Sequence, residues 1–310
     1  MERIADLNRL GSRDRPVLLA AGFLDGLHLG HQAVLRTTVD TAREMEAEAW
    51  VLTVEPHPMK LLHPERAPAV LTDLETRIRL ISEMGLTGCA VLPFTREFSE
   101  MEPEDFLCEL HQRAPVLRGL VVGQNWRFGH RACGDVTLLQ KWAERRDLRV
   151  LIIPPVLWKG LPVSSSRIRQ AIEKGDLPAA TAMLGRPFSM SGTVIHGRNI
   201  GHQLGFPTAN LLPKNEVRPA PGVYAVRISG LDPVRYGAAY YGDRPTFHDG
   251  TLTGLEVHLL DTTQDLYGLD LEVHFLERLR GDLRFATHAA LIEQIRLDVA
   301  CVRTITSRSA

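Results

Sequence analysis

Residues 17–31 read VLLAAGFLDGLHLGH, and this stretch decides how the first half of the chain folds. The first five residues are apolar, as in a strand that is buried on both faces of a parallel sheet. Small residues form the turn that follows, and a segment with apolar residues near helical spacing begins at His31. A strand, a turn and a helix in this order favour an anion site, because free backbone N–H groups and the positive helix end meet there.

Strands and helices are expected to alternate as far as about residue 153. The predicted strands are 16–21, 50–54, 89–93, 117–122 and 148–153, and the predicted helices are 31–49, 71–84, 103–111 and 136–145. This order predicts an α/β domain in which helices cover both faces of a parallel sheet. Two short helices, 167–174 and 177–183, are expected to follow it.

The sequence changes in character after Gly185-Arg186-Pro187. Short segments with alternating apolar residues are separated by turns rich in Gly and Pro, which is typical of an antiparallel barrel or sandwich. The predicted strands are 189–194, 222–228, 255–260 and 271–275, and a last helix is predicted over 289–302. The sequence therefore predicts two domains, 1–185 and 186–310.

Composition argues against several classes of protein. The 310 residues carry a net charge of −1, which weighs against a protein that coats nucleic acid but allows a local nucleotide site. No apolar run approaches the ~20 residues of a membrane span, and the first residues do not resemble a secretory signal. The four cysteines lie far apart, which indicates a reducing cytoplasm rather than a disulfide framework or a zinc knuckle. The oligomeric state stays open.

His28 and His31 stand at the start of the first expected helix, three residues apart, so both can face one ligand. Asp25 and Gly30 belong to the same turn. Imidazolium groups there would hold a triphosphate and stabilise the charge of a leaving pyrophosphate. The alternative is a tight turn with two exposed histidines, but the strand, turn and helix in order favour the nucleotide site.

Two further segments carry polar residues at the ends of expected strands. Asn125 can bind an amide or a ring edge, and Arg127 can bind phosphate. Ser164 and Ser165 precede an expected helix that carries Arg169, and hydroxyls, a helix N-terminus and arginines again suit an anion. Ordinary loop packing and a plain helix cap are the alternatives.

The second half contains LGFPTAN at 204–210. Gly205 lets the loop fold over phosphates, and Thr208 and Asn210 are oxygen donors that point to one side of an extended segment. Such oxygens, together with substrate phosphates, are ligands that Mg²⁺ takes. The alternative is a turn with routine polar caps. Glu256 lies on the polar face of an expected strand, where a carboxylate is usually exposed to solvent.

Together these segments resemble the bacterial bifunctional riboflavin kinase/FMN adenylyltransferase family, also called FAD synthetase. The resemblance rests on GFLDGLHLGH (22–31), EPHP (55–58), VGQNWRFG (122–129), VSSSRIR (163–169) and LGFPTAN (204–210), in this order. It implies a Rossmann-like nucleotidyltransferase domain over 1–185, which joins FMN to AMP from ATP and gives FAD and pyrophosphate. It also implies a β-barrel kinase over 186–310, which makes FMN from riboflavin and ATP. Both activities would need Mg²⁺.

The resemblance implies roles for single residues as well. The positions expected to handle ATP are His28, His31, Asn125, Ser164 and Arg169, and Asp25 matches the aspartate of the first motif. Glu256 would be the general base that takes a proton from the ribityl hydroxyl of the flavin. Thr208 and Asn210 would hold Mg²⁺, and Arg280 would lie near the flavin.

The chain departs from the family pattern at three places. Phe23-Leu24 stands where Asn-Phe usually precedes the aspartate, and Tyr240-Tyr241 stands where Asn-Ile usually precedes the Gly of the run that ends in Arg-Pro-Thr at 244–246. His202-Gln203 replaces the common arginine before LGFPTAN. Two alternatives therefore stay open. One is a monofunctional enzyme in which one of the two modules has lost its activity. The other is a flavin-binding regulatory protein without turnover.

Overall fold

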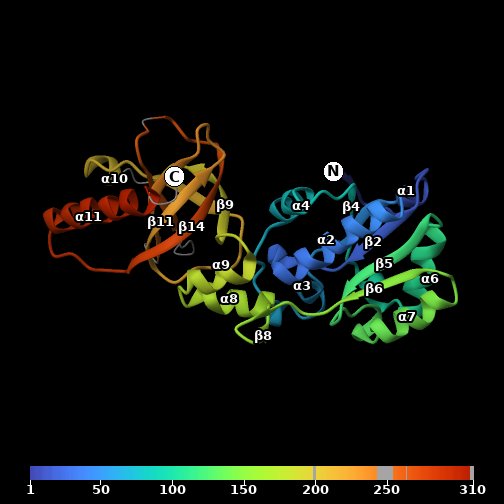
Figure 1. The fold of residues 1–310 in the computed structure, drawn as a ribbon. Coiled ribbons are helices and arrows are strands. Elements are labelled where there is room, and N and C mark those ends of the chain that lie inside the picture. Colours follow the sequence, from blue (N-terminus) through green and yellow to red (C-terminus); the bar gives the residue numbers. More distant parts are fainter. Residues whose placement is uncertain (198–199, 243–253, 263, 308–310) are drawn as a thin grey trace. The chain divides into compact units, whose positions relative to one another are not determined.

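The computed structural model describes residues 1–197, 200–242, 254–262 and 264–307. Two compact units make up the chain, residues 1–165 and residues 166–310 (Figure 1). The first unit is α/β and the second contains a β-barrel followed by a C-terminal helix, so the predicted fold class is confirmed in both.

A six-stranded parallel sheet with strand order β1-β4-β3-β2-β5-β6 forms the centre of the first unit. Its strands are β1 (Glu2–Ile4), β2 (Val17–Ala21), β3 (Glu48–Glu55), β4 (Gly88–Pro93), β5 (Leu117–Gly123) and β6 (Arg149–Ile153). The chain runs from β2 to β3 and β4 in one direction and then crosses to β5 on the other side of β2. Loops at the carboxyl ends of β2, β3 and β5 therefore diverge, and such a point leaves a crevice for a ligand.

Helices cover both faces of this sheet, as predicted. The helices are α1 (Leu7–Gly11), α2 (Leu29–Glu44), α3 (Pro58–Leu62), α4 (Leu74–Ser82), α5 (Arg96–Glu100), α6 (Pro103–Arg113) and α7 (Val136–Glu144), and a short hairpin of β7 (Leu157–Trp158) and β8 (Leu161–Pro162) follows. Helix α4 begins at Leu74 rather than at residue 71, because the Asp73 side chain caps it by accepting the N–H of Thr76.

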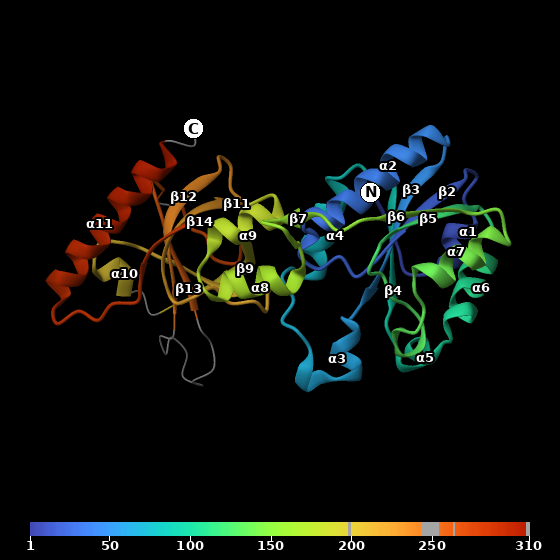
Figure 2. The same ribbon diagram turned by 60° about the horizontal axis from the view of Figure 1, so that its bottom comes forward.

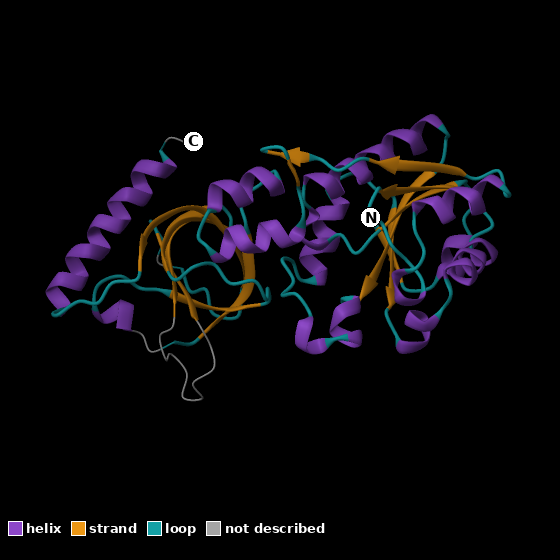
Figure 3. Ribbon diagram, turned by 90° about the horizontal axis from the view of Figure 1, so that it is seen from below, coloured by secondary structure: helices purple, strands orange, loops and turns teal. Residues whose placement is uncertain are grey.

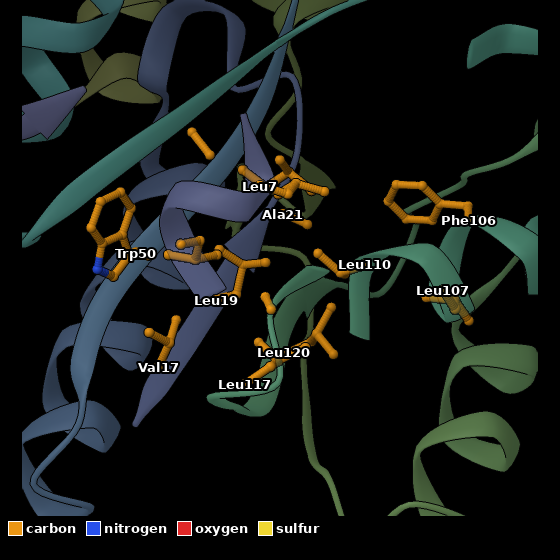
Figure 4. Packing of buried hydrophobic residues seen from close by; sticks show 14 of the residues in the cluster. Leu7, Val17, Leu19, Ala21, Trp50, Phe106, Leu107, Leu110, Leu117 and Leu120 are labelled. Carbon is orange, nitrogen blue, oxygen red and sulfur yellow. The ribbon is translucent and has the colours of Figure 1, made fainter. Parts of the chain in front are cut away.

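Strand β2 supplies side chains to two hydrophobic cores, one on each face of the sheet. All five of its residues are buried. Val17 and Leu19 pack with residues of α6 such as Leu110 (Figure 4), whereas Leu18 and Ala20 pack with residues of α2 and α4 on the other face. The continuous apolar run of β2 thus places the turn after it at the centre of the sheet edge.

The second unit is a closed antiparallel barrel with strand order β10-β13-β12-β11-β14-β9, which Figure 3 shows as a ring. Its strands are β9 (Ser189–Ile195), β10 (Ala209–Pro213), β11 (Gly222–Ser229), β12 (Arg235–Gly242), β13 (Gly254–Leu259) and β14 (Asp270–Gly281). Strands β10 and β12 were not predicted. The first follows a proline turn, and the second consists largely of Gly, Ala and Tyr without a clean alternation.

Helices α8 (Ser165–Glu173), α9 (Leu177–Leu184), α10 (Ile200–Gln203) and α11 (His288–Thr306) complete the second unit. Helix α9 lies beside β14 (Figure 2), and the N–H of Ala220 donates to the carbonyl oxygen of Ile172 at 3.3 Å. Both short helices therefore belong to the compact unit that contains the barrel. The division into activities at 185/186 stays a prediction, because the compact units divide between Ser165 and Ser166.

Among the described residues, no helix is both long enough and apolar enough to cross a membrane.

Candidate functional site

The turn between β2 and α2 brings the two predicted histidines together. His28 is the N-cap of α2, and its Nδ1 accepts the backbone N–H of His31 at 3.3 Å. The two imidazole rings stack with their centroids 3.6 Å apart. Because Nδ1 of His28 is the acceptor in this contact, Nε2 is the ring nitrogen left to donate to a ligand. A Cβ at Gly30 would lie 3.1 Å from Cε1 of His28. A glycine at this position therefore leaves room for the His28 ring.

His31 is a buried ring, and its surroundings disfavour a positive charge on it. Burial lowers its pKa well below the usual range, and the neighbouring His28 and Arg77 lower it further. Its Nδ1 is buried, and no hydrogen-bond partner for that atom occurs in the described part of the chain. The lowered pKa favours the neutral ring at pH 7, and an imidazolium at bound phosphate stays a prediction.

Asp25 anchors the turn. Its carboxylate is 3% exposed and accepts the N–H groups of Leu71 at 2.9 Å and of Thr72 at 3.2 Å. The Ser165 hydroxyl donates to the backbone oxygen of Asp25 at 3.0 Å. Gly26 has φ of 76°, a conformation that glycine adopts without strain. Asp25 and Ser165 thus hold the turn in shape, a role that the sequence did not reveal, and their contact with phosphate stays a prediction.

An apolar pocket of about 720 Å³ opens at the carboxyl ends of β2, β3 and β5. This is where the strand order predicts a ligand crevice. Its lining includes six Phe and Trp side chains that could contact a flat ring: Phe23, Phe94, Phe98, Phe106, Trp126 and Phe128. Trp126 stacks on Phe128 with ring centroids 4.5 Å apart. Pro58 of the EPHP segment also lines the pocket.

The other residues predicted to handle ATP are spread more widely. Arg127 lines the pocket and forms an ion pair with Asp135 at 3.2 Å. Asn125 is exposed in the loop after β5, and Ser164 is half-buried just before α8. Arg169 lies on α8, in the second unit. Contact of these four residues with ATP stays a prediction.

Three barrel strands place the predicted kinase residues in one row. Glu256 on β13 lies directly opposite Asn210 on β10 and directly opposite Tyr240 on β12. Side chains of directly opposed residues in antiparallel strands point to the same face. Leu255 and Val257 are buried inside the barrel, so the row faces outward. We call Asn210, Glu256 and Tyr240 the outer row.

Glycines lie against the predicted Mg²⁺ ligands. A Cβ at Gly197 would collide with the side chain of Asn210, and one at Gly201 would lie 3.0 Å from Oγ1 of Thr208. Thr208 and Asn210 are half-buried on either side of the buried Ala209, so both point away from the barrel interior, and their binding of Mg²⁺ stays a prediction. A hydroxyl and an amide oxygen in a cradle that side chains would fill suit Mg²⁺ together with substrate phosphates. In the described ranges, no group of three or more His, Cys, Asp or Glu side chains could hold a metal.

His258 fixes the LGFPTAN turn beside the outer row, and sequence reasoning did not select it. Its Nδ1 donates to the carbonyl oxygen of Pro207 at 2.8 Å, and its ring meets Phe206 edge to face at 5.5 Å. The backbone at Gly205 has φ of 84°, which glycine accommodates. The signal in the sequence is the alternation of strand 255–260, which puts His258 on the same face as Glu256.

Arg280 is held by the last helix. Its guanidinium donates to the carboxylate of Asp298 on α11 at distances of 2.9–3.1 Å, and only 5% of Asp298 is exposed. This ion pair attaches the end of β14 to α11. The predicted contact of Arg280 with flavin stays a prediction.

The structure separates the two tyrosines at which the chain departs from the family pattern. Tyr240 belongs to the outer row, and its hydroxyl donates to Oδ1 of Asp282 at 3.2 Å. Tyr241 is 2% exposed inside the barrel. The Arg-Pro-Thr run at 244–246 lies outside the described residues.

Two family models match the chain, FAD synthetase over residues 11–167 and riboflavin kinase over residues 184–306. A bifunctional riboflavin kinase/FMN adenylyltransferase of Escherichia coli is 36% identical over 92% of this chain and 91% of its own length. The protein of the same description from Pseudomonas fluorescens is 34% identical over 100% and 99%.

A crystal structure described as that of a macrolide-efflux protein from Streptococcus pneumoniae has a TM-score of 0.86 and 28% identity. The match covers 96% of this chain and 97% of the other. The fold, both motif sets and the two family models agree, and the chain belongs to the bifunctional riboflavin kinase/FMN adenylyltransferase family.

Proposed function

We propose that residues 186–310 phosphorylate riboflavin with ATP to give FMN, and that residues 1–185 join FMN to AMP from ATP to give FAD and pyrophosphate. The observation that carries the proposal is the presence of two separate sites on one chain. One is the histidine turn beside an aromatic pocket, and the other is the outer row of the barrel. ATP is the co-substrate of both reactions, and FMN and FAD are the products.

In the first unit, the triphosphate of ATP would lie at the N-terminus of α2. Free N–H groups there and the Nε2–H of His28 donate to phosphate oxygens, and the negative charge of the nucleotide raises the pKa of His31. An FMN phosphate oxygen attacks the α-phosphorus, and the bond to the β-phosphate breaks as pyrophosphate leaves. The aromatic pocket is the place for the flavin ring, because its volume of about 720 Å³ falls within the range of ligand sites.

In the second unit, Glu256 would take the proton from the ribityl hydroxyl as its oxygen attacks the γ-phosphorus of ATP. Asn210 and Thr208 would hold Mg²⁺, which neutralises charge on the phosphates when it is bound. The register pairs Asn210 with Glu256, which supports a site in which the proposed base and the proposed phosphate-binding side are neighbours. His258 keeps the turn at 205–208 in place.

We also assign the chain to the cytoplasm, where riboflavin, FMN and ATP are its partners and no nucleic acid or membrane is required. The four cysteines are unpaired, which suits a reducing compartment.

Two incubations distinguish this proposal from the two alternatives. The full chain is given riboflavin in one and FMN in the other, each with ATP and Mg²⁺, and the flavins are separated by chromatography. Formation of FAD through FMN supports both activities. FMN alone or FAD only from supplied FMN identifies a single active module, and bound but unchanged riboflavin identifies a binding protein.

The kinase is expected to work without the first unit. A fragment of residues 186–310 should phosphorylate riboflavin without making FAD, and a fragment of residues 166–310 should do so with a higher thermal midpoint. The longer fragment keeps α8 and α9, and α9 packs against β14. Folded fragments that lack kinase activity would show that the two sites depend on each other.

The two tyrosines are expected to act differently. Tyr240→Asn should lower the riboflavin KM, because a bulky ring then leaves the outer row next to Glu256. Tyr241→Ile should leave that KM unchanged and lower the thermal midpoint, because its ring lies inside the barrel. FAD formation from supplied FMN should stay the same in both variants. An unchanged KM in Tyr240→Asn would mean that the flavin does not approach this part of the row.

A further inference from the structure

Arg77 is a buried cation behind the turn between β2 and α2. It lies on α4, and only 1% of its side chain is exposed. One guanidinium nitrogen, Nη2, donates to Oε2 of Glu55 at 2.5 Å, and the other, Nη1, donates to the backbone oxygen of Phe23 at 3.1 Å. Arg77 therefore joins the end of β3 to the turn that follows β2.

The same guanidinium fixes an aromatic ring at the pocket. Its Cζ lies 4.4 Å from the ring centroid of Phe23, within the range of a cation–π contact. The ring of His57 meets Phe23 edge to face at 4.4 Å. Phe23 lines the pocket and stands where the family usually has Asn. Arg77 and His57 thus set the position of a ring that replaces the usual residue.

The hydrogen bonds leave part of the guanidinium unmatched. Nε of Arg77 is buried, and none of the described residues accepts a hydrogen bond from it. A buried guanidinium without full pairing is costly, so its retention calls for a role beyond packing. The charge also acts on the motif. Burial lowers the pKa of His31 most. Its titratable neighbours His28 and Arg77 lower this pKa further.

We propose that Arg77 is a positioning residue for adenylyl transfer, which fixes both the turn that carries His28 and His31 and the Phe23 ring of the flavin pocket. The inference rests on the proposed adenylyltransferase function. Arg77 touches neither substrate in this scheme. It acts through the backbone of Phe23, the ring of Phe23 and the electrostatic environment of His31.

The test compares three variants of the full chain: Arg77→Met, Arg77→Lys and the control Arg79→Met. Arg79 lies on the same helix, is 44% exposed and pairs with Glu83 at 2.6 Å. FAD formation from FMN and ATP is measured across pH, riboflavin phosphorylation is measured on the same preparations, and the His31 ring is titrated by NMR.

Arg77→Met is expected to lower kcat/KM for FAD formation by roughly 10- to 100-fold, as misplacement of a reacting group does. The pKa of His31 rises when the positive charge is removed, so its titration and its limb of the kcat/KM profile move to higher pH. Arg77→Lys keeps the charge and so keeps the limb, but it loses the forked geometry and part of the rate. Kinase activity stays unchanged in all three.

Wild-type FAD formation in Arg77→Met and Arg77→Lys, or an unmoved His31 titration in Arg77→Met, would overturn the inference. Equal loss of both activities in proportion to unfolded protein would reduce Arg77 to a structural residue and overturn it as well. Absence of FAD formation in the wild-type chain contradicts the proposed function instead, and the NMR titration of His31 then still decides whether Arg77 acts on it.

Discussion

Glu256→Gln is expected to lower the rate of FMN formation from riboflavin by about 10²- to 10⁴-fold, the usual cost of losing a general base. The substitution keeps the size and the hydrogen-bonding oxygen of the side chain but removes the group that accepts the proton. Glu256 lies on a barrel strand whose inward neighbours are Leu255 and Val257, so a change on the outward face leaves the core intact. The measurement is the rate of FMN formation at saturating ATP and riboflavin.

A matched control is Glu277→Gln, because Glu277 also lies on a barrel strand and is exposed. It should form FMN at the wild-type rate. Both variants should make FAD from supplied FMN as fast as the wild type, since that reaction belongs to the other site. FMN formation at the wild-type rate in Glu256→Gln would show that the assigned base is wrong.

The order of strands and helices could be predicted because apolar periodicity is a local property. The five apolar residues of β2 indicate a strand buried on both faces, and the structure buries all five. Helix ends were less predictable, because they depend on caps. His28 ends the turn as the N-cap of α2, so the helix begins at Leu29 instead of at residue 31.

Arg77 could not be predicted, because its environment comes from distant segments. In the sequence it is one arginine in an amphipathic helix, a pattern that usually indicates an exposed side chain. Its partners Glu55 and Phe23 come from the ends of two other elements, and only the sheet order brings them to it. Arg77 is buried because of the order of the strands in the sheet. The pattern of residues around it in the sequence does not reveal that order.

The outer row shows a similar limit. The alternation of strand 255–260 predicted Glu256 on the polar face. The sequence of that strand does not indicate which residues lie opposite Glu256 on the neighbouring strands. The register pairs Glu256 with Asn210 and with Tyr240, which belong to the two barrel strands that the apolar pattern did not predict, β10 and β12. The register also turns Tyr241 toward the barrel interior. Substitutions of Tyr240 and of Tyr241 are therefore expected to have different effects on riboflavin binding and on stability.

His31→Ala is expected to lower FAD formation from FMN by about 10²- to 10³-fold, the cost typical of losing one group that stabilises developing charge. The ring of His31 stacks on His28 at the start of α2, where the leaving pyrophosphate is proposed to develop its charge. Burial, His28 and Arg77 lower its pKa, and the negative charge of the nucleotide is expected to raise it and so to strengthen the ring as a donor. The loss should therefore appear mainly in kcat.

The decisive measurement for His31→Ala is the pair of product profiles on riboflavin and on FMN. The variant should convert riboflavin to FMN at the wild-type rate and accumulate it, because Glu256 and the outer row lie on the other compact unit. His31→Ala and Glu256→Gln are expected to have opposite effects. Each variant should lose one of the two reactions and keep the other. FAD formation at the wild-type rate in His31→Ala would remove this residue from the mechanism. Loss of both activities in both variants would mean that the two halves do not act as independent catalysts.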